Sequence, residues 1–99
     1  ERKTKTDLYS SLGQGRARFE REFVRLSALD YTALVIEATY ADLYVRPPHS
    51  KMHPGAVIGS LLAWSVRYRI PVFFAGDRRH GNEITLKLLE WYSQTRAPQ

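Results

Sequence analysis

Two short, continuously apolar runs place the strongest limit on the fold of this chain. The run Ala33-Leu34-Val35-Ile36 is partly β-branched, and the run Pro71-Val72-Phe73-Phe74-Ala75 ends at the turn-forming pair Gly76-Asp77. Strands that are apolar at every position are typical of parallel sheets, because helices cover both faces of such sheets. Segments with helical spacing surround both runs. The sequence therefore predicts an α/β fold with a central, mainly parallel sheet flanked by helices.

Four segments have apolar residues at the spacing of helices. The first is expected to open at Asp7 and end at Gly13, and the third spans residues 55–68 after a proline-rich exposed loop at residues 46–54. The residues expected on the apolar faces are Leu8 and Leu12 in the first helix, Phe19, Phe23 and Leu26 in the second, Ile58, Leu61, Leu62, Ser65, Trp64 and Tyr68 in the third, and Ile84, Leu88, Trp91 and Tyr92 in the last.

Composition narrows the class of protein. With 99 residues, the chain has room for one small core. A net charge of +5 suits a polyanionic partner, although many ordinary soluble proteins have a similar charge. The absence of cysteine excludes disulfides and thiolate metal sites. No apolar run approaches the roughly 20 residues that cross a bilayer, so we expect a soluble intracellular protein with no membrane partner.

The amino end holds residue types that suit phosphodiester hydrolysis. If residues 1–3 form a strand, the side chains of Glu1 and Lys3 point to one face, since strand side chains alternate. A carboxylate can bind a hard cation such as Mg²⁺, and an ammonium can orient the attacking water. Asp7 can fold back to the same place, whereas Arg2 points to the other face, where it can pair with an acid. From spacing alone, a set of solvated charges remains the alternative.

The same residues resemble a known motif. Glu1-Arg2-Lys3-Thr4-Lys5-Thr6-Asp7 is similar to the ERK-x-x-x-D motif of XPF and Hef-type structure-specific nucleases. Further similar features follow in the order of that domain: Leu8, Ser10-Ser11, Gly15-Arg16 with Phe19, Ile36-Glu37, Met52-His53-Pro54 with Ala56 and Gly59, and Ile70-Pro71-Val72. The resemblance covers residues 1–92. The sequence at Arg67-Tyr68 and at Phe74-Ala75-Gly76-Asp77-Arg78 is similar to that of bacterial or phage members of the family.

This resemblance implies a restriction-endonuclease-like core. In it, Glu1 is a metal ligand, Lys3 is the cation beside the attacking water, and Asp7 is an acidic residue needed for cleavage that serves as a further ligand. Arg2 is counted with these three as a catalytic residue. The implied cofactor is Mg²⁺ or Mn²⁺, the implied partner is branched DNA, and domains of this kind commonly pair as dimers. The family's other principal ligand is the Asp of a Gly-Asp motif on a preceding strand. Gly76-Asp77 is in the wrong place to replace it, so residues 1–99 are expected to be one nuclease domain truncated at its amino end, with the activity assigned to the intact parent.

Four further charged residues are candidates for the site. Glu37 ends the first apolar strand, at the sheet edge where α/β folds bind ligands; it is either a supporting acid or an ion-pair partner of Arg2 or Arg16. Arg16, Arg78 and Arg79 are candidates for DNA phosphate contacts, which set position without reading sequence. Ordinary surface charge is the alternative for each arginine.

Histidine and tryptophan residues have structural interpretations. His49 and His53 are four apart, but they lie in a proline-rich loop without a third ligand for zinc. We expect His53 to cap the helix that starts at Pro54. Trp64 and Trp91 fall on apolar helical faces, so we expect them in the core or in a dimer interface rather than as stacking platforms for bases.

Together these features predict a metal-dependent endonuclease that cleaves DNA near a junction between duplex and single strand. The first alternative is a catalytically inactive DNA-binding or dimerisation module of the same fold, which a true absence of an upstream Gly-Asp motif favours. The second is a different nuclease with a Glu-x-Lys core and a sequence preference. The resemblance to bacterial or phage members implies a cytoplasmic, nucleoid-associated protein.

Overall fold

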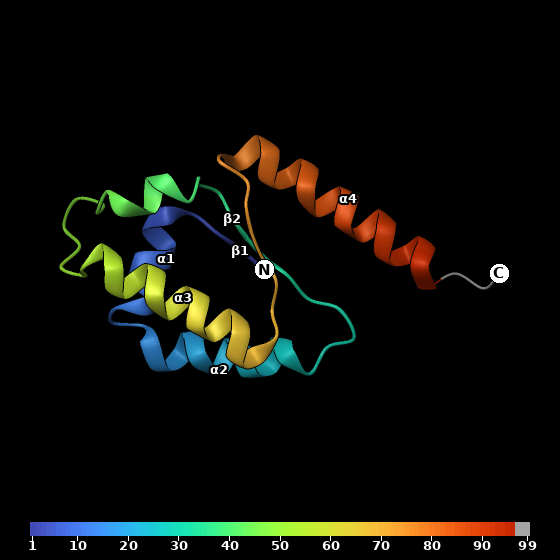
Figure 1. Cartoon of the computed structure of the whole chain (residues 1–99), viewed down its shortest axis with the longest axis horizontal. Coiled ribbons are helices and arrows are strands. Elements are labelled where there is room, and N and C mark those ends of the chain that lie inside the picture. The colour runs from blue at the N-terminus through green and yellow to red at the C-terminus, as the bar shows by residue number, and fades with distance from the viewer. Residues whose placement is uncertain (97–99) are drawn as a thin grey trace.

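A three-stranded parallel sheet with helices on both faces forms the fold (Figure 1). The computed structural model describes residues 1–96. In chain order, the elements are β1 (Arg2–Lys3), α1 (Lys5–Leu12), α2 (Arg16–Ser27), β2 (Leu34–Ile36), the short 3₁₀ helix η1 (Ala41–Tyr44), α3 (Pro54–Tyr68), β3 (Val72–Phe74) and α4 (Arg78–Arg96). The α/β fold expected from the two apolar runs is confirmed, and it is consistent with part of a restriction-endonuclease-like core.

The central strand β2 divides the molecule into two layers. It pairs in parallel with β1 on one side and with β3 on the other, and all three of its residues are buried. Leu34 and Ile36 belong to the core formed with α1, α2 and α3, whereas Val35 lines a hollow beneath α4. Since neighbouring side chains of a strand point to opposite faces, α1, α2 and α3 cover one face of the sheet and α4 covers the other.

Local capping signals set where α1 and α3 begin. The Thr4 hydroxyl accepts a hydrogen bond from the backbone N–H of Asp7 at 3.1 Å, so α1 starts two residues earlier than expected. At α3, His53 Nδ1 accepts a hydrogen bond from the backbone N–H of Gly55 at 3.0 Å, and Pro54 occupies the first turn. The expected role of His53 as a helix cap is confirmed.

Aromatic residues join α2 to α3. The Phe23 and Trp64 rings meet edge to face with their centroids 5.4 Å apart, and Trp64 is buried. The buried residues of α3 are Val57, Ile58, Leu61 and Trp64. The expectation that Leu62 lies on the buried face is wrong, because the stripe that meets α2 runs through Leu61 and Trp64 and turns Leu62 toward solvent, where it is 40% exposed.

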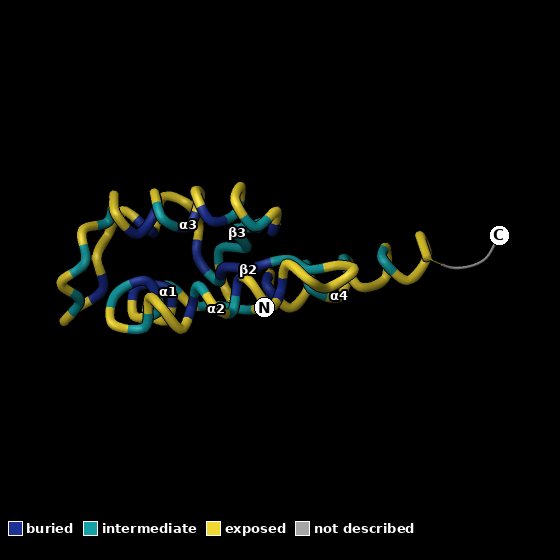
Figure 2. Tube along the Cα trace, turned by 90° about the horizontal axis from the view of Figure 1, so that it is seen from below, coloured by how far each residue is buried: buried dark blue, intermediate teal, exposed yellow. Residues whose placement is uncertain are grey.

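The last helix, α4, extends away from the rest of the molecule (Figures 1 and 2). Gly81 is its buried residue, and the Tyr92 ring contacts the Tyr31 ring at a tilt of 48°, with the ring centroids 5.0 Å apart. Trp91 is 67% exposed and so does not join the core of this chain, because α4 runs beyond the edge of the small sheet. None of the helices within residues 1–96 combines the length and the apolar composition that a membrane span requires.

Candidate functional site

Glu1 and Lys3 lie together in a groove between β1 and the helices α1 and α2. The groove has a volume of about 520 Å³ and is lined by Glu1, Lys3, Ser10, Ser11, Gln14, Gly15, Arg18, Phe19 and Glu22. The fold thus brings the two charged side chains of the amino-terminal segment next to hydroxyl, amide and guanidinium groups from two helices. These groups can bind a cation, a water molecule and a phosphate within one open site.

An aromatic ring holds the Lys3 ammonium in this groove. Lys3 Nζ lies 5.0 Å from the centroid of the Phe19 ring. Phe19 is buried and packs edge to face on Phe23, with the ring centroids 5.1 Å apart. A cation over an aromatic face is stabilised by about 0.5–2 kcal/mol, depending on how far it is desolvated. The core of α2 therefore restricts where the Lys3 charge can lie.

A second carboxylate, Glu22 of α2, lies in the same groove and was missed by sequence reasoning. The hydrogen bond from Arg25 lowers the pKa of Glu22 below its usual range, although burial opposes this effect, and the Lys3 ammonium lowers this pKa further. Glu22 lines the groove together with Glu1 and Lys3. Helical spacing is the signal that points to it, since Glu22 follows Phe19 by three positions on α2.

Asp7 lies at the edge of this arrangement. It is exposed in the first turn of α1 and is not among the residues that line the groove. Ser10 and Ser11, which do line it, follow Asp7 by three and four positions, so the three share one stripe of the helix. The role of Asp7 in the site stays a prediction.

Arg2 points to the opposite face of β1. Its Nη2 donates a hydrogen bond to Glu37 Oε2 at 2.7 Å, and its Nη1 donates to Asn82 Oδ1 at 2.9 Å. The Glu37 side chain is 14% exposed and does not line the groove. Of the two interpretations of Glu37, the structure favours the ion pair with Arg2, and neither residue faces Glu1 and Lys3 across the groove.

The three arginines considered for DNA contacts lie outside the groove. Arg16 donates to Ser60 Oγ at 3.0 Å, and its guanidinium lies 4.8 Å from the Trp64 ring, so it packs on α3. Arg78 and Arg79 are exposed in the first turn of α4, on the other face of the sheet. Sequence reasoning did not single out the arginine that does line the groove, Arg18.

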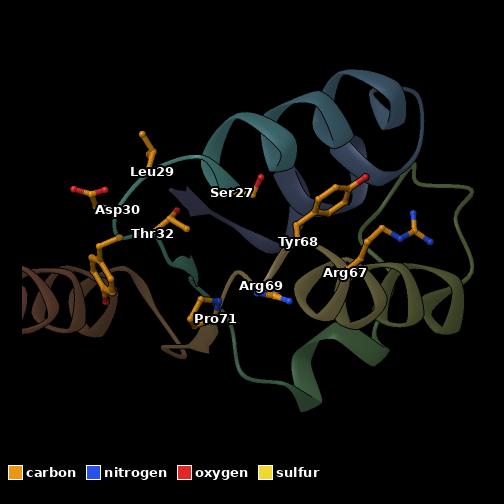
Figure 3. Close-up of a pocket in the computed structure, with 9 residues that line it drawn as sticks. Ser27, Leu29, Asp30, Thr32, Arg67, Tyr68, Arg69 and Pro71 are labelled. Carbon is orange, nitrogen blue, oxygen red and sulfur yellow. The ribbon is translucent and has the colours of Figure 1, made fainter.

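A second hollow lies at the amino ends of β2 and β3 (Figure 3). It has a volume of about 430 Å³ and is lined by Ser27, Leu29, Asp30, Tyr31, Thr32, Arg67, Tyr68, Arg69 and Pro71. Arg67 pairs with Glu20 at 3.3 Å and Asp30 pairs with Arg96 at 3.2 Å. Figure 3 shows Asp30 and Arg67 at opposite ends of the hollow. Its charged groups therefore do not converge on one ligand.

The oxygen donors of the groove suit a hard cation. Within residues 1–96, no group of three or more His, Cys, Asp or Glu side chains is placed to hold a metal ion. The groove combines the carboxylates of Glu1 and Glu22 with the hydroxyls of Ser10 and Ser11. Mg²⁺ is bound through one or two carboxylates and keeps several waters and substrate oxygens. The donor chemistry therefore fits Mg²⁺ or Mn²⁺.

A family model matches most of this chain. The model of the family described as "ERCC4 domain" matches residues 1–88. No curated protein matches the chain. The matched range includes the three strands, the groove and the first turns of α4. Because this match spans most of the 99 residues, the chain belongs to the ERCC4 domain family, which comprises XPF-type nuclease domains that act on DNA.

Proposed function

We propose that this chain carries catalytic residues of a metal-dependent DNA endonuclease that hydrolyses phosphodiester bonds at branched or flapped DNA. The observation that carries the proposal is the groove in which Glu1 and Lys3 lie beside Glu22. Membership of the ERCC4 domain family supplies the nuclease class. The net charge of +5 suits a polyanionic substrate. The proposed cofactor is Mg²⁺ or Mn²⁺.

Each charged residue of the site has a proposed role. Glu1 and Asp7 are the proposed metal ligands, and Glu22 adds negative charge that attracts the cation. A bound cation supplies polarisation of a phosphoryl oxygen and of the attacking water. Lys3, held over Phe19, orients the water and stabilises the charge that develops on the phosphate.

The arginines have separate proposed roles. Arg2 holds β1 from behind and does not touch the substrate. Arg18 lines the groove and is placed to bind a phosphate of the strand that enters it. Arg16 contributes mainly through its packing on Trp64. Arg78 and Arg79 remain proposed phosphate contacts for a duplex arm that reaches the α4 face.

The test compares cleavage of forked, flapped and plain duplex DNA of one sequence in Mg²⁺, in Mn²⁺ and in a chelator. The activity is proposed for the protein that contains this chain, so that protein is assayed beside the chain itself. We expect Glu1→Gln and Lys3→Met to lower kcat by about 10²–10³-fold. Glu90→Gln, an exposed change on α4, is the matched control. Equal cleavage by Glu1→Gln and the unmodified protein refutes the proposal.

The exposed apolar residues of α4 favour a second candidate, a module that pairs with another copy. These residues are Leu86, Leu89 and Trp91. We propose that α4 contributes to a homodimer through Leu86 and Leu89, because these exposed apolar side chains are three positions apart and so are neighbours on the helix surface. Size-exclusion chromatography coupled to light scattering measures the molecular mass of the protein in solution. A monomer at all concentrations contradicts this proposal, and a dimer that binds DNA without cutting it favours the inactive module over the nuclease.

A further inference from the structure

One guanidinium joins three elements of the fold. Arg2 belongs to β1, donates from Nη2 to Glu37 just after β2, and donates from Nη1 to Asn82 in α4. Its Nη2 also donates to the backbone carbonyl of Arg78 at 3.4 Å. The side chain therefore ties the strand of Glu1 and Lys3 to the first turns of the helix on the opposite face of the sheet.

A glycine allows this close contact. Gly81 is the buried residue of α4, and a Cβ there would lie 2.7 Å from Arg2 Nη2 and 3.1 Å from Arg2 Cζ. Real Cβ atoms essentially never approach other atoms to 2.7 Å. Arg2 Nε is buried without a hydrogen-bond partner, so the guanidinium is packed against the helix backbone and is not simply solvated. All three of the nearest atoms that a Cβ at position 81 would meet belong to the end of the flexible Arg2 side chain, so a side chain there displaces the Arg2 guanidinium.

The strand β1 is short and lies at an edge of the sheet. It has two residues and pairs with β2 alone. The backbone N–H of Val35 donates to the Glu1 carbonyl at 2.9 Å, and that of Glu37 donates to the Lys3 carbonyl at 2.8 Å. The Glu1 ammonium donates to the Ala33 carbonyl at 3.1 Å, and Lys3 lies over the Phe19 ring. Arg2 adds the side-chain contact between this strand and α4, and a two-residue edge strand is expected to open more easily than the buried core.

The helix α4 is held near both of its ends. A hollow of about 200 Å³ lies between it and the sheet, and Glu1 and Arg2 line it together with apolar side chains such as Val35 and Leu88. Toward the carboxyl end of α4, Tyr92 contacts Tyr31 and Arg96 pairs with Asp30 at 3.2 Å. At the other end, the contacts of Arg2 act on the first turns of the helix, together with the hydrogen bonds that the chain just before α4 makes to the end of β2.

We propose that Arg2 is a positioning residue that couples α4 to the groove. Successive strand side chains point to opposite faces, so anchoring Arg2 on α4 sets the direction of Glu1 and Lys3 on the groove side. A partner or second copy that displaces the first turns of α4 therefore changes the groove through Arg2. The effect on cleavage rests on the proposed nuclease function, whereas the effect on the hydrogen bonds of β1 does not.

The proposed coupling between Arg2 and the hydrogen bonds of β1 is tested by amide hydrogen exchange in the full chain. Gly81→Ala displaces Arg2, so we expect the Val35 and Glu37 amides to exchange about tenfold faster, as for the loss of a hydrogen bond to a charged group. The matched control is Gly59→Ala on α3, where a Cβ meets nothing within 4 Å; it leaves both amides unchanged. In an Arg2→Lys background, Gly81→Ala adds no further increase, because the atoms that the Cβ meets are gone. Equal exchange in the two alanine variants, or additive effects of the Arg2 and Gly81 changes, overturns the coupling.

The proposed effect of Arg2 on cleavage is tested by steady-state kinetics with a DNA substrate. We expect Gly81→Ala to lower kcat about tenfold while KM for DNA stays within about threefold, because the groove residues remain present but are misdirected. A change in KM alone, or faster exchange with unchanged kcat, overturns the positioning role. If the unmodified protein cleaves no DNA, the proposed function fails, and the exchange measurement still decides whether Arg2 couples α4 to β1.

Discussion

Replacing Phe19 by leucine separates the contribution of this ring to the core from its contribution to the groove. Phe19 is buried, packs edge to face on Phe23 at 5.1 Å and lies 6.0 Å from Trp64. Each aromatic pair contributes about 0.5–1.5 kcal/mol beyond the burial of area, so losing two pairs lowers the free energy of unfolding by about 1–3 kcal/mol. Losing the face beneath the Lys3 ammonium removes about 0.5–1 kcal/mol more.

The matched control is Phe23→Leu, because the Phe23 ring packs on Phe19, Trp64 and Tyr68 but not on Lys3. Urea unfolding measures the stability of both variants, and cleavage is assayed where both are folded. We expect both to lose stability and only Phe19→Leu to lose kcat. A double-mutant cycle with Lys3→Met isolates the contact between the ammonium and the ring. A coupling energy of zero in this cycle, or equal kcat in the two variants, refutes the reasoning that the core holds Lys3 in place.

Three other groups give further predictions. Tyr9→Phe leaves the buried carbonyl of Leu43 without the hydroxyl that donates to it at 2.5 Å, so the free energy of unfolding falls by about 1–3 kcal/mol in a urea titration. Burial raises the pKa of Tyr9 in the folded chain, so its contribution to stability is fully present below the unfolded pKa of about 10 and is lost as pH rises toward the folded value; alkaline unfolding that Tyr9→Phe leaves unchanged contradicts this. Thr4→Ala removes the side chain that caps α1, so the free energy of unfolding falls by about 1 kcal/mol in thermal unfolding. The control is Thr6→Ala, which leaves this cap in place. Glu22→Gln removes a negative charge from the groove, so the Mg²⁺ concentration for half-maximal cleavage rises about tenfold; an unchanged requirement shows that Glu22 does not act on the cation.

Local pattern was enough to predict the four α-helices and the two apolar strands, but not the start of α1 at Lys5 or the 3₁₀ helix η1. The apolar run at Leu34–Ile36 identified the buried central strand, and the proline after His53 identified the start of α3. Alternation along β1 also predicted that Lys3 and Arg2 point to opposite faces, as their contacts with Phe19 and with α4 show. These features depend on neighbours within one helical turn or along one strand, so the order of residues alone carries them.

Tertiary structure decided which side chains meet. Arg2 and Asn82 are 80 positions apart, and their contact depends on where α4 crosses the sheet. Glu22 reaches the groove, and Leu62 turns to solvent, because of the way α2 and α3 rotate when their aromatic residues pack. Helical spacing identifies an apolar face but not the angle at which another helix meets it. The amino-terminal motif was therefore visible in the sequence, whereas the groove around it and the contacts of Arg2 behind it exist only in the folded chain.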